Sequence, residues 1–211
     1  MLWNILGGSM RKAEMGMAGW VLVGLGIFVL FSIVYVMGKY NGLVRTDTEV
    51  QNRWGYVQSA YQLRADKIPN LVETVKGAKN FEQETLIKIA ELRSQAGQAK
   101  IDVGNAKDVA ELEQAESSMR SVLSRLMVIV ENYPDLKSNQ NFLALQDEIS
   151  ETENKIQFER NKYNEAVKGY QTGVRMFPGN IIAGMFGFGV DKHKMFQAED
   201  GAQKAPKVSF G

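Results

Sequence analysis

The single histidine is the residue whose type most directly suggests chemistry. His193 stands in the run Asp191-Lys192-His193-Lys194, and the chain has no cysteine. A metal site would therefore need carboxylates as its other ligands, and no acidic residues cluster at a spacing typical of metal ligands. We expect His193 to be a solvated surface residue, and we predict neither a metal nor another cofactor.

Acidic residues in the C-terminal half are the next candidates for catalysis. Glu151 and Glu153 are two positions apart, which places them on different sides of a helix and prevents joint acid/base action. Glu148, Glu151 and Lys155 share one face, as a row of exposed ion pairs would. The glycine-rich run 184–189 resembles a phosphate loop, but no strand is predicted before it and its interior is aromatic. The sequence therefore predicts no catalytic residue, and we expect that the protein is not an enzyme.

The charge of the chain argues against nucleic acid as a partner. The formal net charge is +1, and the residues after Gly38 carry equal numbers of basic and acidic side chains. A neutral domain has no basic field that attracts phosphate backbones. It also lacks the polybasic attraction to anionic lipids.

An uncharged stretch, Met15–Gly38, predicts a transmembrane helix that follows a leader at residues 1–14. About 20 apolar residues are needed to cross the hydrocarbon core. A cleaved signal peptide is the alternative, but the stretch is long for that role and no small-x-small site clearly follows it. The flanking basic residues do not decide which side of the membrane holds the rest of the chain. The predicted anchor residues are Trp20, Leu25, Phe28, Phe31 and Tyr35, with the two amphipathic rings near the ends of the helix.

A helical stripe begins directly after this stretch, so the membrane helix is predicted to continue into the first helix of a bundle. Apolar residues recur at spacings of three, four and seven. Pro69 interrupts the pattern, since proline removes a helical hydrogen bond. With the polar Asn70 beside it, Pro69 is a candidate hinge, and a purely structural bend is the alternative. The stripe contains Leu43, Val50, Trp54, Val57, Tyr61, Ile68, Leu71, Val72 and Val75.

Three further amphipathic segments complete the predicted bundle, which covers residues 39–177. We expect helices at 82–99, 108–132 and 139–177, a loop at 100–107 and a turn at 133–135. Stripes of this kind must bury against one another, which predicts an all-α, elongated antiparallel helical bundle. Core positions are Leu86, Ile89 and Leu92, then Val109, Leu112, Met119, Val122, Leu126 and Ile129, then Phe142, Leu145, Ile149, Thr152, Ile156, Tyr163, Val167, Tyr170, Val174 and Phe177. Exposed i,i+4 ion pairs are predicted for Glu49/Arg53, Glu84/Lys88, Glu116/Arg120 and Glu151/Lys155.

The C-terminal segment 178–211 is apolar and rich in glycine at its start. We expect a short helix there that caps the end of the bundle. The alternatives are a contact with the membrane interface or with another subunit. Strand signals are nearly absent before residues 206–210, where one occurs. The residues that would make the oligomer or lipid contact are Ile181, Ile182, Met185, Phe186 and Phe188.

Several motifs together resemble the LemA family. They are Tyr40-Asn41-Gly42-Leu43-Val44-Arg45, Val50-Gln51-Asn52-Arg53-Trp54, the run from Ile68 to Gly77, Glu131-Asn132-Tyr133-Pro134-Asp135-Leu136-Lys137, the run from Glu151 to Ile156, and the run from Phe177 to Ala183. The resemblance covers nearly the whole chain. It implies an N-terminal membrane anchor followed by an elongated helical bundle, with no assigned catalytic activity. A magnetosome-associated relative is linked to membrane invagination, and in some members the soluble part is thought to face the cytoplasm.

We therefore predict a non-enzymatic, single-pass protein of the bacterial inner membrane. The favoured function is an oligomeric scaffold that organises or remodels membrane, with the bundle on the cytoplasmic side by family analogy. The alternative is a membrane-bound sensor or adaptor that binds a protein or ligand through the bundle. The expected partners are the lipid bilayer, further copies of the chain and other membrane proteins, but no nucleic acid.

Overall fold

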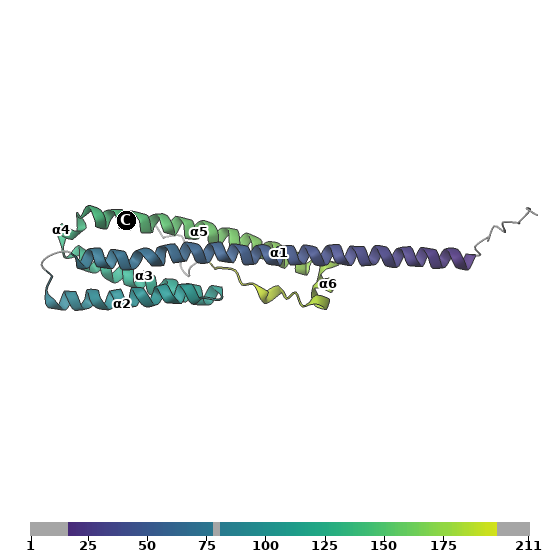
Figure 1. The fold of residues 1–211 in the computed structure, drawn as a ribbon, viewed down its shortest axis with the longest axis horizontal. Coiled ribbons are helices and arrows are strands. Elements are labelled where there is room, and N and C mark those ends of the chain that lie inside the picture. Colours follow the sequence, from purple (N-terminus) through teal and green to yellow (C-terminus); the bar gives the residue numbers. More distant parts are fainter. Residues whose placement is uncertain (1–16, 78–80, 198–211) are drawn as a thin grey trace, which may run out of the picture. The chain divides into compact units, whose positions relative to one another are not determined.

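The computed structural model describes residues 17–77 and 81–197, and these residues form helices and no strand (Figure 1). The chain divides into two compact units, Met1–Gly42 and Leu43–Gly211. The all-α prediction is confirmed. The predicted leader at 1–14 and the strand signal at 206–210 lie outside the described residues.

The first unit contains the beginning of helix α1, which runs from Met17 to Lys76. An 18-residue window of this helix has a mean hydropathy of 2.5 and none of it is buried, so α1 is a candidate membrane span. Each predicted anchor residue is about half exposed or more: Trp20, Leu25, Phe28, Phe31 and Tyr35. An exposed apolar surface of this length is the kind that a membrane-spanning helix presents to lipid.

The second unit is a helical bundle built from α1 after Leu43 and the helices that follow. Short connections join these long helices, so consecutive ones run antiparallel (Figure 1). At 1.5 Å per residue, the 36 residues of α5 extend about 54 Å, which makes this bundle elongated. Its other helices are α2 (Gln83–Asn105), α3 (Val109–Glu131), α4 (Pro134–Lys137), α5 (Gln140–Arg175), α6 (Gly179–Phe186) and the 3-10 helix η1 (Val190–Lys192).

The predicted stripes form the core of the bundle with a few exceptions. Val57, Leu112 and Ile156, from three different helices, are completely inaccessible to solvent. Leu86 and Phe177 were predicted in the core but are 43% and 80% exposed. Leu86 lies near the start of α2 and Phe177 lies beyond the end of α5, where no neighbouring helix covers the stripe. Trp54, Leu145 and Ile129 are only partly buried.

The predicted loop at 100–107 is wrong, because α2 continues to Asn105. Ala99 and Val103 are buried and extend the apolar face of the helix, which outweighs the turn signal of Gly104. The connection is reduced to residues 106–108, and Gln58 of α1 donates a hydrogen bond of 2.7 Å to the carbonyl of Ala106. Asp108 then caps α3 by accepting from the backbone N–H of Glu111.

Helix α1 passes through Pro69 without ending there. Ile68 and Leu71 on either side are buried, so this part of the helix is held by packing on the other helices of the bundle. Asn70 is exposed. The predicted hinge therefore lies in a packed region, and whether it moves remains a prediction.

Pro69→Ala tests whether the proline is needed. An interior proline costs a helix about 3 kcal/mol relative to alanine, so we expect Pro69→Ala to stabilise the bundle by about 1–3 kcal/mol. Thermal unfolding followed by circular dichroism in detergent measures the change, with Asn70→Ala as the exposed neighbouring control. A lower unfolding temperature for Pro69→Ala would mean that the packing depends on the shape that proline gives the helix.

Candidate functional site

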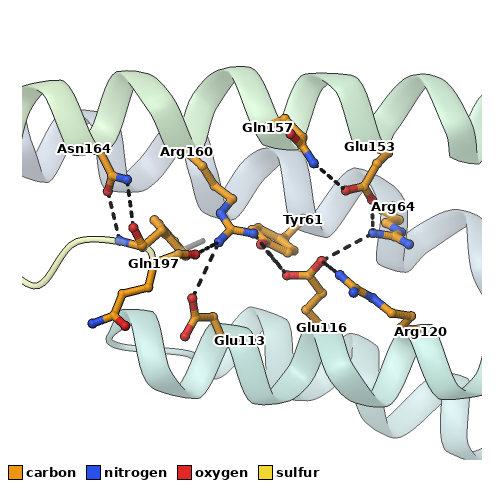
Figure 2. Close-up of polar contacts among 11 residues, drawn as sticks. Tyr61, Arg64, Glu113, Glu116, Arg120, Glu153, Gln157, Arg160, Asn164 and Gln197 are labelled. Carbon is orange, nitrogen blue, oxygen red and sulfur yellow. Dashed lines mark hydrogen bonds and ion pairs between the residues drawn. The ribbon is translucent and has the colours of Figure 1, made fainter. Parts of the chain in front are cut away.

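A group of charged side chains, some buried and some exposed, lies where α1, α3 and α5 meet (Figure 2). Its centre is Glu116 of α3, which is only 4% exposed. The hydroxyl of Tyr61 in α1 donates a hydrogen bond of 2.6 Å to one carboxylate oxygen of Glu116. Arg120, one turn along α3, donates to the other oxygen at 2.8 Å. We call this group the charge cluster: Tyr61, Arg64, Glu113, Glu116, Arg120, Glu153 and Arg160.

Arginines from α1 and α5 complete the charge cluster. Arg64 lies 3.8 Å from Glu116 and also pairs with Glu153 of α5. Arg160 of α5 lies 3.6 Å from Glu113 and 3.8 Å from Glu116. Three arginines thus balance three glutamates. The predicted pair Glu116/Arg120 exists, but the prediction that it lies on a solvent-exposed face is wrong for Glu116, because other helices cover that carboxylate.

Burial raises the pKa of two members of the charge cluster, Tyr61 and Glu113. Burial raises the pKa of Tyr61 far above its usual value, and the charge and hydrogen bond of Glu116 raise it further. Tyr61 therefore stays a hydrogen-bond donor at every physiological pH. Burial also raises the pKa of Glu113, against the opposing charge of Arg160. Each oxygen of Glu116 already accepts a hydrogen bond, so this arrangement serves to fix three helices in register.

Of the three other predicted i,i+4 pairs, two form, and no ion pair joins Glu151 to Lys155, both of which the structure describes. Glu49/Arg53 and Glu84/Lys88 form ion pairs of 2.7 Å on exposed faces. From the predicted exposed row on α5, Glu148 pairs with Lys67 of α1 and so connects two helices. In the described part of the chain, residues 17–77 and 81–197, no group of three or more metal-ligating side chains occurs.

The second polar site ties the C-terminal segment to α1. We call residues 187–197 the strap. Asp47 of α1 is 8% exposed, and its carboxylate lies 2.7 Å from Nε2 of His193 and 2.9 Å from Nζ of Lys192. The His193 ring packs edge-on against Tyr170, with centroids 5.0 Å apart. The prediction of a solvated His193 is therefore wrong: its side chain is 13% exposed, because a carboxylate from a distant part of the sequence meets it.

The strap is also fixed along α5. The side-chain amide of Asn164 donates to the carbonyl of Phe196 and accepts from its N–H, both at 2.9 Å. Arg160 donates to the carbonyl of Gln197 at 3.1 Å, as Figure 2 shows. The Phe196 ring stacks on Trp54, with centroids 6.3 Å apart, and lies under the Arg160 guanidinium. Burial raises the pKa of the neighbouring Tyr163 to about 12.

The residues predicted for an oligomer or lipid contact do not all lie on the surface. Ile182 is 4% exposed and packs into the bundle, and Phe188 is half-buried. Ile181, Met185 and Phe186 are 54%, 72% and 50% exposed. The short helix predicted here is α6, and it has one buried face and one open face.

A cleft between α2 and α3 has no counterpart in the sequence-based predictions. Its volume is about 730 Å³. Leu92 and Ile129 contribute to its lining, and Val128 is 59% exposed there. Periodicity predicts which face of each helix packs, but the width of the groove between two helices depends on their separation. Its charged and polar lining includes Glu82, Thr85, Lys88, Glu91, Gln95, Arg125, Asn132 and Tyr133.

Glu116→Gln tests the charge cluster. Removing the charge leaves buried arginine groups without full compensation, and we expect a loss of about 3 kcal/mol in the free energy of unfolding. The control Glu49→Gln breaks an exposed pair and should cost less than about 1 kcal/mol. Urea unfolding of the detergent-solubilised chain measures both. Equal losses would contradict a special role for the buried carboxylate.

Asp47→Asn tests the attachment of the strap through its pH dependence. Burial alone raises the pKa of Asp47, but hydrogen bonds and charges from His193 and Lys192 outweigh it, so the net pKa lies below 3.8. A lowered folded pKa means that the stabilisation is present above about pH 4 and disappears as the pH falls through the folded pKa. The difference in unfolding free energy between wild type and Asp47→Asn should therefore be larger at pH 6 than at pH 3. Asp102→Asn, on an exposed face of α2, should show no such dependence.

Comparisons with known proteins agree with this architecture. The LemA family model matches residues 53–210. Protein LemA of Metamycoplasma hominis is 32% identical over 154 residues, which cover 73% of this chain and 67% of the relative. Magnetosome protein MamQ 2 of Paramagnetospirillum magneticum is 30% identical over 47% of this chain and 36% of its own length. Magnetosome protein MamQ of Magnetospirillum gryphiswaldense is 26% identical over 62% of this chain and 46% of its own length.

The chain thus spans less than half of the magnetosome relatives and about two thirds of the mycoplasma protein. The family match covers α2 to α6 entirely, together with the part of α1 that contributes Tyr61 and Arg64 to the charge cluster. On this match and on the identity to Protein LemA, the chain belongs to the LemA family.

Proposed function

We propose that this protein is a non-enzymatic membrane scaffold, which is held in the bilayer by the first part of α1 and self-associates through the surface of α2 and α3. The observation that supports this proposal is the cleft between these helices, where the exposed Val128 lies beside the apolar Leu92 and Ile129. A cleft that combines a few apolar side chains, one of them well exposed, with charged and polar ones is typical of a protein interaction site.

The charges around the cleft favour a second copy as its occupant. Lys88 and Arg125 lie there together with Glu82 and Glu91. A surface with both signs of charge can pair with itself, because a two-fold axis places the cations of one copy near the anions of the other. Anchoring in one bilayer confines the copies to the same surface and raises their effective concentration.

Self-association of anchored copies would gather their membrane helices and thereby organise the surrounding lipid. The likeness to magnetosome proteins supports such a role, as the family resemblance implies. The proposed location is the bacterial inner membrane, with the bundle on the cytoplasmic side.

A sensor or adaptor is the second candidate. The same cleft is lined by hydrogen-bonding groups of Thr85, Gln95, Asn132 and Tyr133. These groups suit a different protein or a small ligand as well as they suit a second copy of this chain. In this case Pro69 in α1 would serve as the hinge. The two candidates differ in what fills the cleft.

Counting copies in a bilayer tests the scaffold. We expect the full chain, reconstituted at increasing density in lipid vesicles, to form oligomers that chemical crosslinking and single-molecule photobleaching detect. Val128→Arg should reduce the oligomeric fraction several-fold, because it places a charge in the cleft. The matched control Ile101→Arg changes an equally exposed residue of α2 that does not line the cleft, and should leave the oligomers intact.

A chain that stays monomeric at every density contradicts the scaffold. If a pull-down with this monomer from native membranes instead recovers one membrane protein in fixed stoichiometry, and Val128→Arg abolishes that complex, the adaptor function is supported.

A further inference from the structure

Apolar side chains are exposed where α5 ends and α6 packs on the bundle. Met176 is 62% exposed, Phe177 80%, Ile181 54% and Met185 72%. We call these four residues the α6 patch. Neither the charge cluster nor the strap uses them, and they lie apart from the lining of the cleft between α2 and α3.

The α6 patch is held rigidly on the surface. Ile182 and Ala183 bury the opposite face of α6. At the start of this helix a Cβ on Gly179 would lie 2.4 Å from the carbonyl oxygen of Gly173, so only glycine permits the close approach. Gly187 ends the helix with a φ of 77°, and the N–H of Phe188 bonds the carbonyl of Ala183 at 2.9 Å. The exposure of the patch is therefore a consequence of how α6 is docked.

Chain connectivity limits the distance between this end of the bundle and the last residue of the uncharged stretch. A Cβ on Gly173 would lie 3.4 Å from Cδ2 of Leu43, so the end of α5 touches the residue at which the second unit begins. Leu43 follows Gly38, the last residue of the uncharged stretch, by only five positions. Five residues extend at most about 18 Å. If Gly38 marks the edge of the bilayer, Leu43 stays within that reach of it in whatever direction the anchor leaves the bundle.

We propose that the α6 patch inserts into the boundary between the headgroups and acyl chains of the bilayer that holds the anchor. Helix α6 has eight residues and no charge, which is too short to cross a bilayer but sufficient to lie in its interface. Arg175, exposed beside the patch, fits the headgroup phosphates, as basic residues at a membrane surface do. The inference rests on the proposed function in one respect, namely the membrane anchor.

The area of the patch favours lipid over a second copy. Its four side chains expose on the order of 500 Å², whereas each partner of a stable protein interface buries roughly 800 Å². A lipid contact needs no such minimum, because the anchor already holds the patch at the surface and the association is intramolecular.

Lipid quenching of a single label tests the proposal. The chain has no cysteine, so Met185→Cys provides a unique site for an environment-sensitive fluorophore in the full chain reconstituted in phosphatidylcholine and phosphatidylglycerol vesicles. We expect spin-labelled lipids to quench this label several-fold more than a label at Ile87→Cys, an exposed position in α2. Phe28→Cys, in the anchor, shows the quenching of a label within the bilayer. Adding Ile181→Asp should lower the quenching at position 185 several-fold.

Two results would overturn the inference. One is equal quenching of the labels at positions 185 and 87 by lipid. The other is a label at position 185 that aqueous iodide quenches at low protein density and that becomes protected from iodide only when copies associate. That result would assign the patch to a contact with a second copy. The oligomeric fraction and its response to Val128→Arg report self-association, whereas lipid quenching of the label at position 185 reports lipid contact. Failure of the scaffold and failure of the lipid contact therefore give separate signals. Lack of quenching at position 28 would instead remove the anchor and, with it, the inference.

Discussion

The buried carboxylate of Glu116 is the constraint on which the arrangement of the bundle depends. A charge inside a protein is tolerated only when hydrogen bonds and opposite charges compensate for the water that it loses. Here the compensation comes from Tyr61 on α1 and Arg160 on α5 as well as from its own helix. Apolar stripes alone can slide past one another by a helical turn, about 5.4 Å, and still bury their side chains. Helix α3 cannot slide in this way, because a shift of that size would separate the Glu116 carboxylate from its hydrogen-bond and ion-pair partners.

The same register positions the C-terminal segment. Arg160 faces the charge cluster and also holds the carbonyl of Gln197, so one guanidinium serves both the core and the strap. Asn164, one turn further along α5, fixes Phe196 by two hydrogen bonds. Beyond it, Asp47 on α1 holds His193. The strap is tied at these points, and at the other end of α6 Gly179 packs closely on Gly173, so α6 is docked from both sides.

The cleft between α2 and α3 and the α6 patch both expose apolar side chains outside the core and the strap, and we propose that they bind different partners. The cleft between α2 and α3 carries charges of both signs, which suits another protein. The α6 patch lies on and just before an uncharged helix. It adjoins the end of α5, which contacts Leu43 five positions after the uncharged stretch, and this suits lipid. A LemA-family bundle with both surfaces would associate sideways while keeping a fixed contact with the membrane.

The sequence by itself determined the helical class, the candidate membrane span and most helix boundaries, because these depend on neighbours a few residues away. Asp108–Asn132 was predicted as a helix and α3 occupies Val109–Glu131, since capping and periodicity are local properties. The long helix predicted from residue 139 is likewise α5. The extension of α2 to Asn105 was missed because a local turn signal competed with burial of Val103, which only packing provides.

Only the tertiary structure decided the environment of individual polar residues. Glu116 has the spacing of an exposed ion pair, yet it meets Tyr61, which lies 55 residues away in the sequence. His193 stands among charged residues, yet it is covered by a contact with Asp47 across 146 residues. Ile182 and Met185 belong to one short apolar run, and docking buried the first and exposed the second. Periodicity states which face of a helix is apolar, but the partner that covers that face, and so the burial of each charge, is fixed only when distant helices pack together.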